Sequence, residues 1–397
     1  MKAKKVAEIL KKTATAAWDS KRKFMRMAVL CMVGSKILSG CSQEDVQASA
    51  EQIAEATGLN PDNMTTVFNG VVNSAKAVDR TTTAAADLGL GAVAKITDFF
   101  GIGETEEEEM VIPSEFKGGG DLSVHFIDVG QGDAILLSYT EDGNTEYALI
   151  DAGDNSKGTA VQKYLMDNGV DHLKYLILTH PDADHIGGAD VIISKFDIDK
   201  IYMSGVENDT ATYRDVIDAI EYRSYKYEVP AAGTAFHLGA AEMLILAAPT
   251  EYEDVNNDSL VVKASYGDSS FLFMGDAEFE EEEELLQMFA DVDDTLDVDV
   301  LKAGHHGSYS SSSNEFIAEA TPQWTVISCG MDNQYGHPHN TTLYNLADYE
   351  SALLRTDIQG TIICTTNGTS YEWNKQETQN WKSGEEITKA DYEYEME

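Results

Sequence analysis

The sequence predicts a layered α/β domain that follows a helical or disordered spacer. Two observations support this prediction. From Asp121 onward, short β-branched runs alternate with segments of helical periodicity, as in a sheet covered by helices. The strand-like runs also fall into two series, the second beginning near Glu242, which fits two packed halves of one domain of about 245 residues.

Residues 1–41 have the pattern of a secretory signal. A basic lead precedes the short apolar stretch MAVLCMVGSKIL and then LSGC. Leu38 to Cys41 resembles the lipobox of bacterial lipoproteins, in which the cysteine carries the lipid. It predicts an extracytoplasmic lipoprotein, anchored to the cell membrane at Cys41, because the apolar stretch is too short to span a bilayer. Lys36 interrupts that stretch and leaves an amphipathic N-terminal helix with a chance cysteine as the alternative.

Residues 42–120 are predicted to be a spacer. Segments such as EDVQASAEQIAEAT have helical spacing, and GETEEEEMVIPSEFKGGGD combines a charge run, a proline and three glycines. We therefore expect a few soft helices or partial disorder, followed by a solvated linker.

Residues 121–373 carry the strand and helix patterns of the folded domain. The first series of expected strands is DLSVHFIDV, DAILLSY, EYALIDAG and LKYLILT, and the second is EMLILAAP, SLVVKASY, SFLFMGD, DVDVLKAG, WTVISCG, LLRTD and TIICTT. Helices are expected at TAVQKYLMDNG, EFEEEEELLQMF and TLYNLADYESA. The polar, acidic tail at 374–397 is expected to fray.

Charge and cysteine content restrict the classes of function. The net charge of −41 excludes tight non-specific binding to nucleic acid or anionic lipid. Cys329 and Cys364 each lie inside an apolar run. They could pair outside the cell, but two buried thiols are the simpler interpretation.

The stretch LTHPDADHIGG, directly after the strand pattern LKYLIL, concentrates potential metal ligands. His180, Asp182, Asp184 and His185 lie within six residues, and a tight turn at a strand end can project them into one small volume. Imidazole suits zinc, and carboxylate oxygen suits zinc and harder ions. The two aspartates would repel each other unless a cation held them. The stretch predicts a metal site, with an Asx-rich turn and incidental histidines as the alternative.

Other strand-like runs are also followed by histidine or aspartate. These residues are Asp151 after YALI, Asp276 after FLFMG, His305 and His306 after LKAG, and His337 and His339 in YGHPHN. Because a repeated strand-end position is hard to obtain by chance, we expect these side chains to converge on the ligand loop.

Taken in order, these blocks resemble the metallo-β-lactamase superfamily, and within it the C-terminal hydrolase domain of ComEC-type competence proteins. The resemblance runs from Val124 to Trp373 and rests on FIDVGQGDAILL, LIDAG, LILTHPDADHIGG, NNDSLVV, FLFMGDAE, LKAGHHGS, YGHPH and LLRTDIQGTI. It implies a four-layer αββα sandwich with two divalent metal ions between the sheets. It does not imply transport, because these blocks contain no counterpart of the ComEC membrane channel.

The resemblance also assigns roles to individual residues. The implied metal ligands are His180, Asp182, Asp184, His185, Asp276 and His305. Asp276 matches the carboxylate that bridges both ions, and Asp151 matches an outer carboxylate that orients the ligand loop. His305 is favoured over His306 as the later histidine ligand. Outer positions are expected for Asp151, Gln131, Asn256 and His306.

One departure from the superfamily pattern concerns the first metal ion. Most members supply a further histidine between the ligand loop and the bridging aspartate, but His237 falls in no family block. Asn256 and Ser259 match the ComEC-type branch better, so the first ion is expected to be under-ligated, weakly held or completed by water. Zn²⁺ suits a histidine-rich site, whereas Asp182 in place of histidine moves the site towards Mn²⁺.

The expected chemistry is hydrolysis by a metal-bound hydroxide, with the leaving oxygens of a phosphate ester held by the metal pair. Asp184 would orient the nucleophile. His337 or His339 would protonate the leaving group or contact the phosphate, with a buttressing role as the alternative. The turn VGQGDA, which contains Gln131 and Asp133, either abuts the site or is an ordinary hairpin turn.

The leading hypothesis is therefore a phosphodiesterase or nuclease on the cell surface. The resemblance implies DNA as substrate, but Asp121 to Gly360 holds 11 Lys and Arg against 45 Asp and Glu, a net charge of 11 − 45 = −34. Such a domain should bind DNA weakly. A hydrolase of a small ester, lactone or lactam is the second hypothesis, and a surface-tethered module without turnover is the third. The sequence indicates no protein partner.

Overall fold

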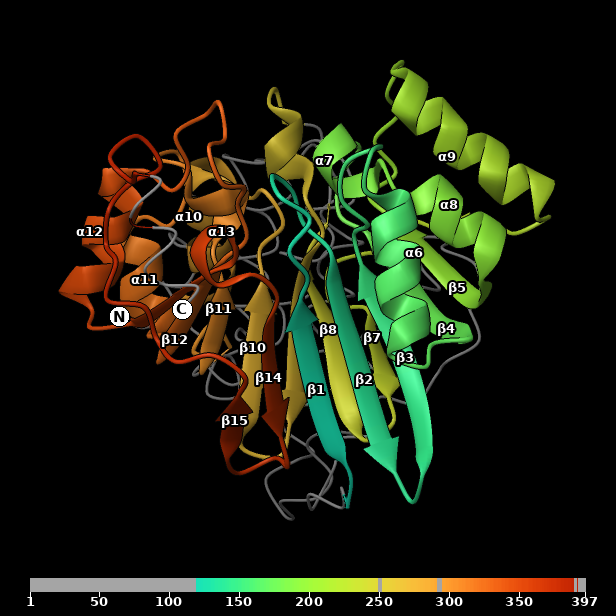
Figure 1. Ribbon diagram of the computed structural model, residues 1–397, viewed down its shortest axis with the longest axis horizontal. Coiled ribbons are helices and arrows are strands. Elements are labelled where there is room, and N and C mark those ends of the chain that lie inside the picture. Colours follow the sequence, from blue (N-terminus) through green and yellow to red (C-terminus); the bar gives the residue numbers. More distant parts are fainter. Residues whose placement is uncertain (1–118, 249–251, 291–294, 389–390, 392–397) are drawn as a thin grey trace, which may run out of the picture. The chain divides into compact units, whose positions relative to one another are not determined.

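Two β-sheets pack face to face between two layers of helices (Figure 1). The computed structural model describes residues 119–248, 252–290, 295–388 and 391. The expectations for the signal, for the lipid anchor and for the spacer up to residue 118 lie outside these residues. None of the helices in the described part of the chain has both the length and the apolar character that a membrane span requires.

The first half of the domain builds most of one sheet and its helices. Its elements are β1 (Asp121–Phe126), β2 (Ile135–Glu141), β3 (Asn144–Ile150), α6 (Gly158–Asp167), β4 (His172–Leu178), α7 (Ala183–Ile186), α8 (Ala189–Lys195), β5 (Asp197–Met203), α9 (Ala211–Tyr222) and β6 (Tyr227–Glu228).

The second half builds the other sheet and then returns to the first. Its elements are β7 (Ala235–Leu238), β8 (Ala241–Ala247), β9 (Val261–Tyr266), β10 (Ser269–Phe273), α10 (Phe279–Phe289), β11 (Val300–Lys302), α11 (Asn314–Ala320), β12 (Trp324–Ile327), α12 (Asn340–Asp348), β13 (Ala352–Arg355), α13 (Thr356–Gln359), β14 (Ile362–Thr366) and β15 (Tyr371–Trp373). Short 3-10 turns lie at Val255–Asp258 and Gly304–Gly307.

The strand order gives each sheet an edge where the carboxyl ends of parallel strands meet. One sheet has the order β15-β14-β1-β2-β3-β4-β5-β6, and the other has the order β13-β12-β11-β10-β9-β8-β7. Strands β3 to β6 are mutually parallel, and so are β10 to β13. The carboxyl ends of parallel strands meet at one edge of a sheet, which is where open α/β folds place their ligands.

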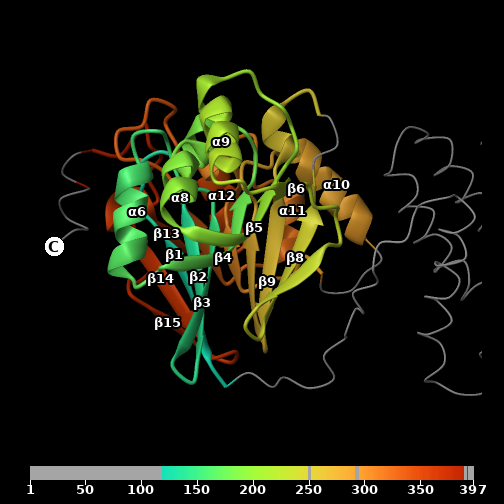
Figure 2. The ribbon, with the colours of Figure 1, turned by 90° about the vertical axis from the view of Figure 1, so that its right-hand side faces the viewer.

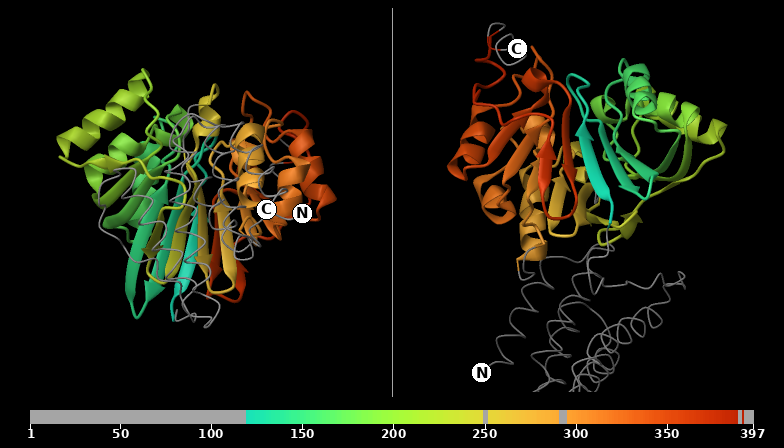
Figure 3. Two further views of the ribbon diagram at one scale, coloured as in Figure 1. Left: turned by 180° about the vertical axis from the view of Figure 1, so that it is seen from behind. Right: turned by 60° about the horizontal axis from the view of Figure 1, so that its bottom comes forward.

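The alternation of the strands explains the layers. Alternate residues such as Val124 and Leu137 of the first sheet and Val262 and Phe271 of the second share one buried apolar cluster between the sheets. The intervening residues face outward. They are covered by α6, α8 and α9 on one side and by α10, α11 and α12 on the other (Figures 2 and 3). The predicted four-layer αββα sandwich is confirmed.

The acidic tail differs from the sequence expectation, because residues 374–388 pack on the domain instead of fraying. Thr378 donates its backbone N–H to Leu353 O at 2.8 Å, and the Gln359 side chain donates to Gln376 O at 2.7 Å. The buried Arg355 guanidinium donates to Lys382 O. Buried donors need acceptors, and the tail backbone supplies them.

Cys329 and Cys364 are free, buried thiols, as the simpler sequence interpretation predicted. Burial raises the pKa of both thiols. Both are therefore inert apolar side chains in this fold.

Candidate metal centre

The carboxylate of Asp276 lies among four imidazoles. Its oxygens are 3.1 Å from Nε2 of His185, 3.3 Å from Nε2 of His306, 3.8 Å from Nε2 of His305 and 3.9 Å from Nε2 of His180. Asp276 follows β10 and is 3% exposed. Convergence of the same ring atom from four histidines on one carboxylate is the arrangement expected around bound cations.

Asp151 contacts the ligand loop, where the resemblance implies an outer carboxylate. Its Oδ2 accepts from the Thr179 hydroxyl at 2.7 Å and lies 2.9 Å from Nδ1 of His185, while its Oδ1 accepts from the Thr179 backbone N–H at 2.9 Å. His185 therefore donates from Nδ1 and directs Nε2 towards Asp276. The Thr179 hydroxyl lies 3.2 Å from Nδ1 of His180, which directs that ring in the same way.

His305 and His306 are placed the other way round from the sequence expectation. His306 is buried, with Nδ1 3.0 Å from Ser328 O and Nε2 in the cluster. His305 is partly exposed and binds Glu278 Oε1 through Nδ1 at 2.7 Å. Both residues have positive φ, 43° for His305 and 55° for His306. This strained backbone directs the two adjacent rings to different partners.

Two groups of the ligand loop fit a metal because they form no hydrogen bond with the described residues. The buried Nε2 of His180 has no hydrogen-bond partner among the described residues, and the Asp276 carboxylate lies 3.9 Å away. Burial lowers the pKa of His180 to about 3, which keeps the ring in the neutral form that binds metals. The side chain of Asp182, at the start of α7, makes no hydrogen bond or ion pair with any described residue. Burial raises its pKa. A cation would satisfy both groups.

Asp184 contacts the cluster from its open side. Its Oδ2 lies 3.2 Å from Nε2 of His306, and its side chain is 30% exposed, against 4% for Asp276. Burial alone would raise its pKa. The hydrogen bond from His306 and the charge of His185 hold the pKa of Asp184 below its ordinary value.

Positive charge within the cluster compensates its carboxylates. Although burial opposes the charged form, the carboxylates of Asp276 and Asp151 raise the pKa of His185 well above its ordinary value. Asp276 and Asp133 raise the pKa of His306 in the same way. Against the effect of burial, these two imidazolium charges lower the pKa of Asp276. Cations would replace these protons, because metal ligands bind in their deprotonated forms.

The buried ion pair of Lys302 and Asp133 lies behind the imidazoles. Lys302 is fully buried, donates to Gly275 O at 3.1 Å and pairs with Asp133. Asp133 belongs, by distance, to a group with His185, Asp276 and His306 whose ligand atoms lie within 4.8 Å. The Asp133 carboxylate lies 3.5 Å from Nδ1 of His306 and 3.9 Å from Nδ1 of His185. In both rings Nδ1 is on the edge opposite to the Nε2 atom that faces Asp276. We therefore assign Asp133 an outer, orienting position.

The turn VGQGDA abuts the site, which settles one of the alternatives left by the sequence. Asp133 donates its backbone N–H to Asp184 O at 3.1 Å, and a Cβ on Gly132 would lie 2.2 Å from the same oxygen. Only glycine permits this approach. The side chain of Gln131 lies 3.3 Å from Nδ1 of His337.

His337 and His339 differ in role. Gln131 accepts the Gly330 N–H through Oε1 at 3.2 Å, so its amide donates to His337 Nδ1 and leaves the His337 proton on Nε2. His339 accepts from Tyr309 N at 3.0 Å and donates from Nε2 to Tyr335 O at 3.1 Å. Both of its ring nitrogens therefore buttress the loop.

Between the ligand loop and Asp276, the part of the chain described here contributes no further histidine to the cluster. His237 is exposed on β7. Ser259, which also lies between the ligand loop and Asp276 in the chain, contacts the cluster: its Oγ lies 3.4 Å from Nδ1 of His180 and accepts from the Asp276 N–H at 3.0 Å. Asn256 contributes to the low pKa of Glu278, together with His305 and Ser310 and against the effect of burial.

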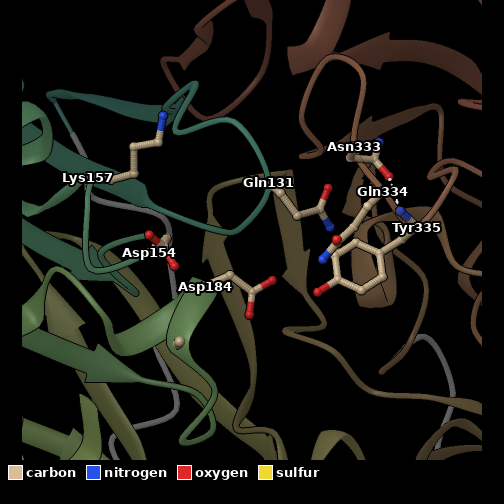
Figure 4. A pocket seen from close by; sticks show the side chains of 8 residues that line it. Gln131, Asp154, Lys157, Asp184, Asn333, Gln334 and Tyr335 are labelled. Atoms are coloured by element: carbon tan, nitrogen blue, oxygen red, sulfur yellow. Dashed lines mark hydrogen bonds between the residues drawn. The ribbon is translucent and has the colours of Figure 1, made fainter. Parts of the chain in front are cut away.

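A pocket of about 340 Å³ opens beside the cluster at Asp184 (Figure 4). Lys157, which precedes α6, lies on one wall, and Asn333 and Tyr335 form the opposite wall. Gln131 and Asp184 lie between the two walls. Asp184 is the cluster residue that the pocket reaches.

Comparisons with known proteins agree with this geometry. Residues 127–330 match the family model described as the metallo-beta-lactamase superfamily. ComE operon protein 3 of Bacillus subtilis is 31% identical over 257 residues, covering 60% of this chain and 32% of that protein. Recombination protein 2 of Haemophilus influenzae is 31% identical over 245 residues, covering 60% and 28%. The chain is thus distantly homologous to competence proteins and spans about a third of their length.

Solved structures give a weaker likeness. The metallo-beta-lactamase fold protein YhfI of Bacillus subtilis is 13% identical, with a TM-score of 0.41, covering 62% of this chain and 100% of YhfI.

Proposed function

Since the chain belongs to the metallo-beta-lactamase superfamily, we propose that it is a metal-dependent hydrolase of phosphodiester bonds. The observation that supports the metal dependence most directly is the convergence of the Nε2 atoms of His180, His185 and His306 on the Asp276 carboxylate. Outer acceptors such as Asp151 orient these rings, as in metal sites.

The donor set fits two divalent ions, with zinc suited to the histidines and manganese to the carboxylates. His180 and Asp182 would hold one ion, and Asp184, His185 and His306 the other, with Asp276 shared between them. A bound ion pair lowers the pKa of water towards 7 and stabilises the leaving oxygen of a phosphate ester.

Asp184 lies at the pocket, and His337 lies next to the cluster, with its ring centre 6.0 Å from that of His306. The exposed part of Asp184 faces the pocket, where its carboxylate accepts a hydrogen bond from the attacking water and orients it. Gln131 keeps the His337 proton on Nε2, so His337 donates a neutral N–H to a phosphate oxygen instead of acting as an acid. Burial lowers the pKa of His337 to about 3, in agreement with this role.

The likeness to competence and recombination proteins favours DNA as the phosphodiester. The net charge of −34 between Asp121 and Gly360 favours a weakly bound strand or a small diester over tightly held duplex. A small ester, lactone or lactam on the same site is the second candidate, and the same charge favours it.

We also propose that the protein is a lipoprotein outside the cytoplasm, anchored at Cys41. The proposal rests on the sequence LSGC after a basic, apolar leader. Labelled palmitate should enter the wild type but not Cys41→Ala. Equal labelling of both proteins would contradict the anchor.

The function is tested by Asp276→Ala in the full chain. Removing the shared carboxylate leaves two cations to repel each other. The metal content should fall well below two ions per chain, and hydrolysis of bis(4-nitrophenyl) phosphate should fall more than about a hundredfold. Asp268→Ala, an exposed turn aspartate, is the control. Unchanged metal content and turnover in Asp276→Ala would refute the assignment.

A further inference from the structure

Lys157 is the cationic side chain of the pocket beside the metal centre. The other lining residues are neutral or acidic. Lys157 is half-buried, and its ammonium forms no ion pair or hydrogen bond with the residues that the structure describes. Lys163, Lys174 and Lys200 each pair with a carboxylate. Lys195 and Lys226 are, like Lys157, without a partner among the described residues, but they do not line the pocket. An unpaired ammonium in so acidic a domain attracts an anionic ligand.

The backbone and the stem of Lys157 are held in place. Its N–H donates to Asp154 O at 2.7 Å, within a turn that Asp154 Oδ1 closes by accepting from Ser156 N at 2.9 Å. A Cβ on Gly130 would lie 3.5 Å from the Lys157 Nζ, and one on Gly153 would lie 3.3 Å from its Cβ. The lysine stem therefore passes between two turns, which lowers the entropy cost of binding a ligand.

The opposite wall presents an aromatic ring on a fixed loop. Tyr335 is 55% exposed and stacks on His337, with ring centres 5.5 Å apart and an angle of 22°. Asn333 holds the loop by accepting from Tyr335 N at 3.2 Å and from His337 N at 2.9 Å. Figure 4 shows Lys157 and Tyr335 on opposite sides of Asp184.

We propose that Lys157 determines substrate specificity by binding a negatively charged group of the substrate, while Tyr335 stacks on a planar part. This inference rests on the proposed hydrolase function of the same site. It names the substrate class as an anionic phosphodiester with a planar substituent, such as a nucleotide unit, and disfavours neutral lactones and lactams. The ammonium gains a charge-assisted hydrogen bond that a neutral substrate cannot offer.

Two dinucleotides that differ in charge test the inference. Dithymidine phosphorothioate is anionic and resists hydrolysis, and dithymidine methylphosphonate carries the same bases without the charge. Binding is measured by calorimetry to the full chain in excess Mn²⁺, with metal content checked for each variant. Lys157→Ala should lower the affinity for the anionic probe about tenfold and leave the affinity for the neutral probe within about twofold of the wild-type value. Lys157→Arg should retain the preference. Tyr335→Ala should weaken both probes alike.

The control is Lys195→Ala, an exposed lysine at the end of α8. Equal effects of Lys157→Ala on both probes, no effect on either, or no binding of either probe to the wild type would overturn the inference. Turnover is assayed separately with bis(4-nitrophenyl) phosphate. Charge-dependent binding through Lys157 without turnover would refute the proposed function and support the specificity assignment. Turnover together with binding that does not depend on charge would support the proposed function and refute the specificity assignment.

Discussion

His305 and His306 are adjacent in the chain, yet their side chains meet different partners. His306 is buried between Asp184 and Asp276, whereas His305 is tied to Glu278 at the edge of the cluster. A ligand and an orienting neighbour should respond differently to removal of the ring.

We therefore predict that His306→Ala loses bound metal and that His305→Ala keeps most of it. Metal content after dialysis against buffer, with circular dichroism to verify folding, checks the prediction. The expected loss in metal affinity exceeds about a hundredfold for His306→Ala, and is smaller for His305→Ala. Equal metal loss in both variants would mean that the two rings are equivalent ligands.

Residue types at strand ends were predictable, but several partners were not. The sequence predicts the ligand loop and Asp151 because each places polar residues directly after an apolar run. The choice between His305 and His306 depends on two left-handed backbone positions, which the spacing of the residues does not encode. The burial of Lys302 is not predictable from the sequence, because a lysine at the end of a strand is usually solvated and its partner Asp133 lies about 170 positions away.

At the scale of elements, α10 supports the loop that carries these histidines. Glu282 of α10 is buried and accepts from the backbone N–H groups of Ser312 and, at 2.9 Å, Ser313. Burial raises its pKa from 4.5 to about 7. The pKa of Glu282 is higher in the folded state than in the unfolded state. Its contribution to the free energy of unfolding is therefore fully present below about pH 4.5 and is lost as the pH rises through about 7.

We predict that Glu282→Gln removes this pH dependence. Between pH 5 and pH 8, the free energy of unfolding of the wild type should fall relative to the variant by about 2 kcal/mol. Urea denaturation at the two pH values measures the difference. Glu280→Gln, at an exposed position of the same helix, should behave like the wild type. A constant difference between wild type and Glu282→Gln would show that Glu282 does not titrate in this range.

The strands were the most predictable elements, because each expected run alternates between the inter-sheet core and a helical layer. The segment from α8 to β7 was not assigned from the sequence. The docking of the tail cannot be predicted from its composition, since it depends on the buried donors of Arg355 and Gln359.

At the scale of the whole molecule, the negative charge of the domain opposes binding of the proposed substrate, DNA, which is also negatively charged. A basic nuclease loses DNA affinity as salt rises, because counterion release drives its binding. This domain carries few cations, and salt screens its repulsion of DNA.

We predict that any DNA cleavage needs metal, ignores sequence and has a high apparent KM that does not rise between low and moderate salt. Plasmid nicking with manganese or zinc across a salt series, beside a chromogenic diester, is the measurement. Tight DNA binding that collapses with salt would contradict the prediction and would require a cationic surface. Cleavage of neither substrate by the metal-loaded protein would favour a lactone or lactam.

The two sides of the metal centre come from distant parts of the chain, with His185 after one sheet's strand and Asp276 after the other's. Ions shared between them would tie together positions about 90 residues apart in the folded domain only, so their binding free energy would add to the stability of the fold. The described domain has no disulfide to do this. Chelation should accordingly lower the melting temperature by several degrees. Loss of metal would then make the protein more sensitive to proteolysis in addition to removing the proposed activity.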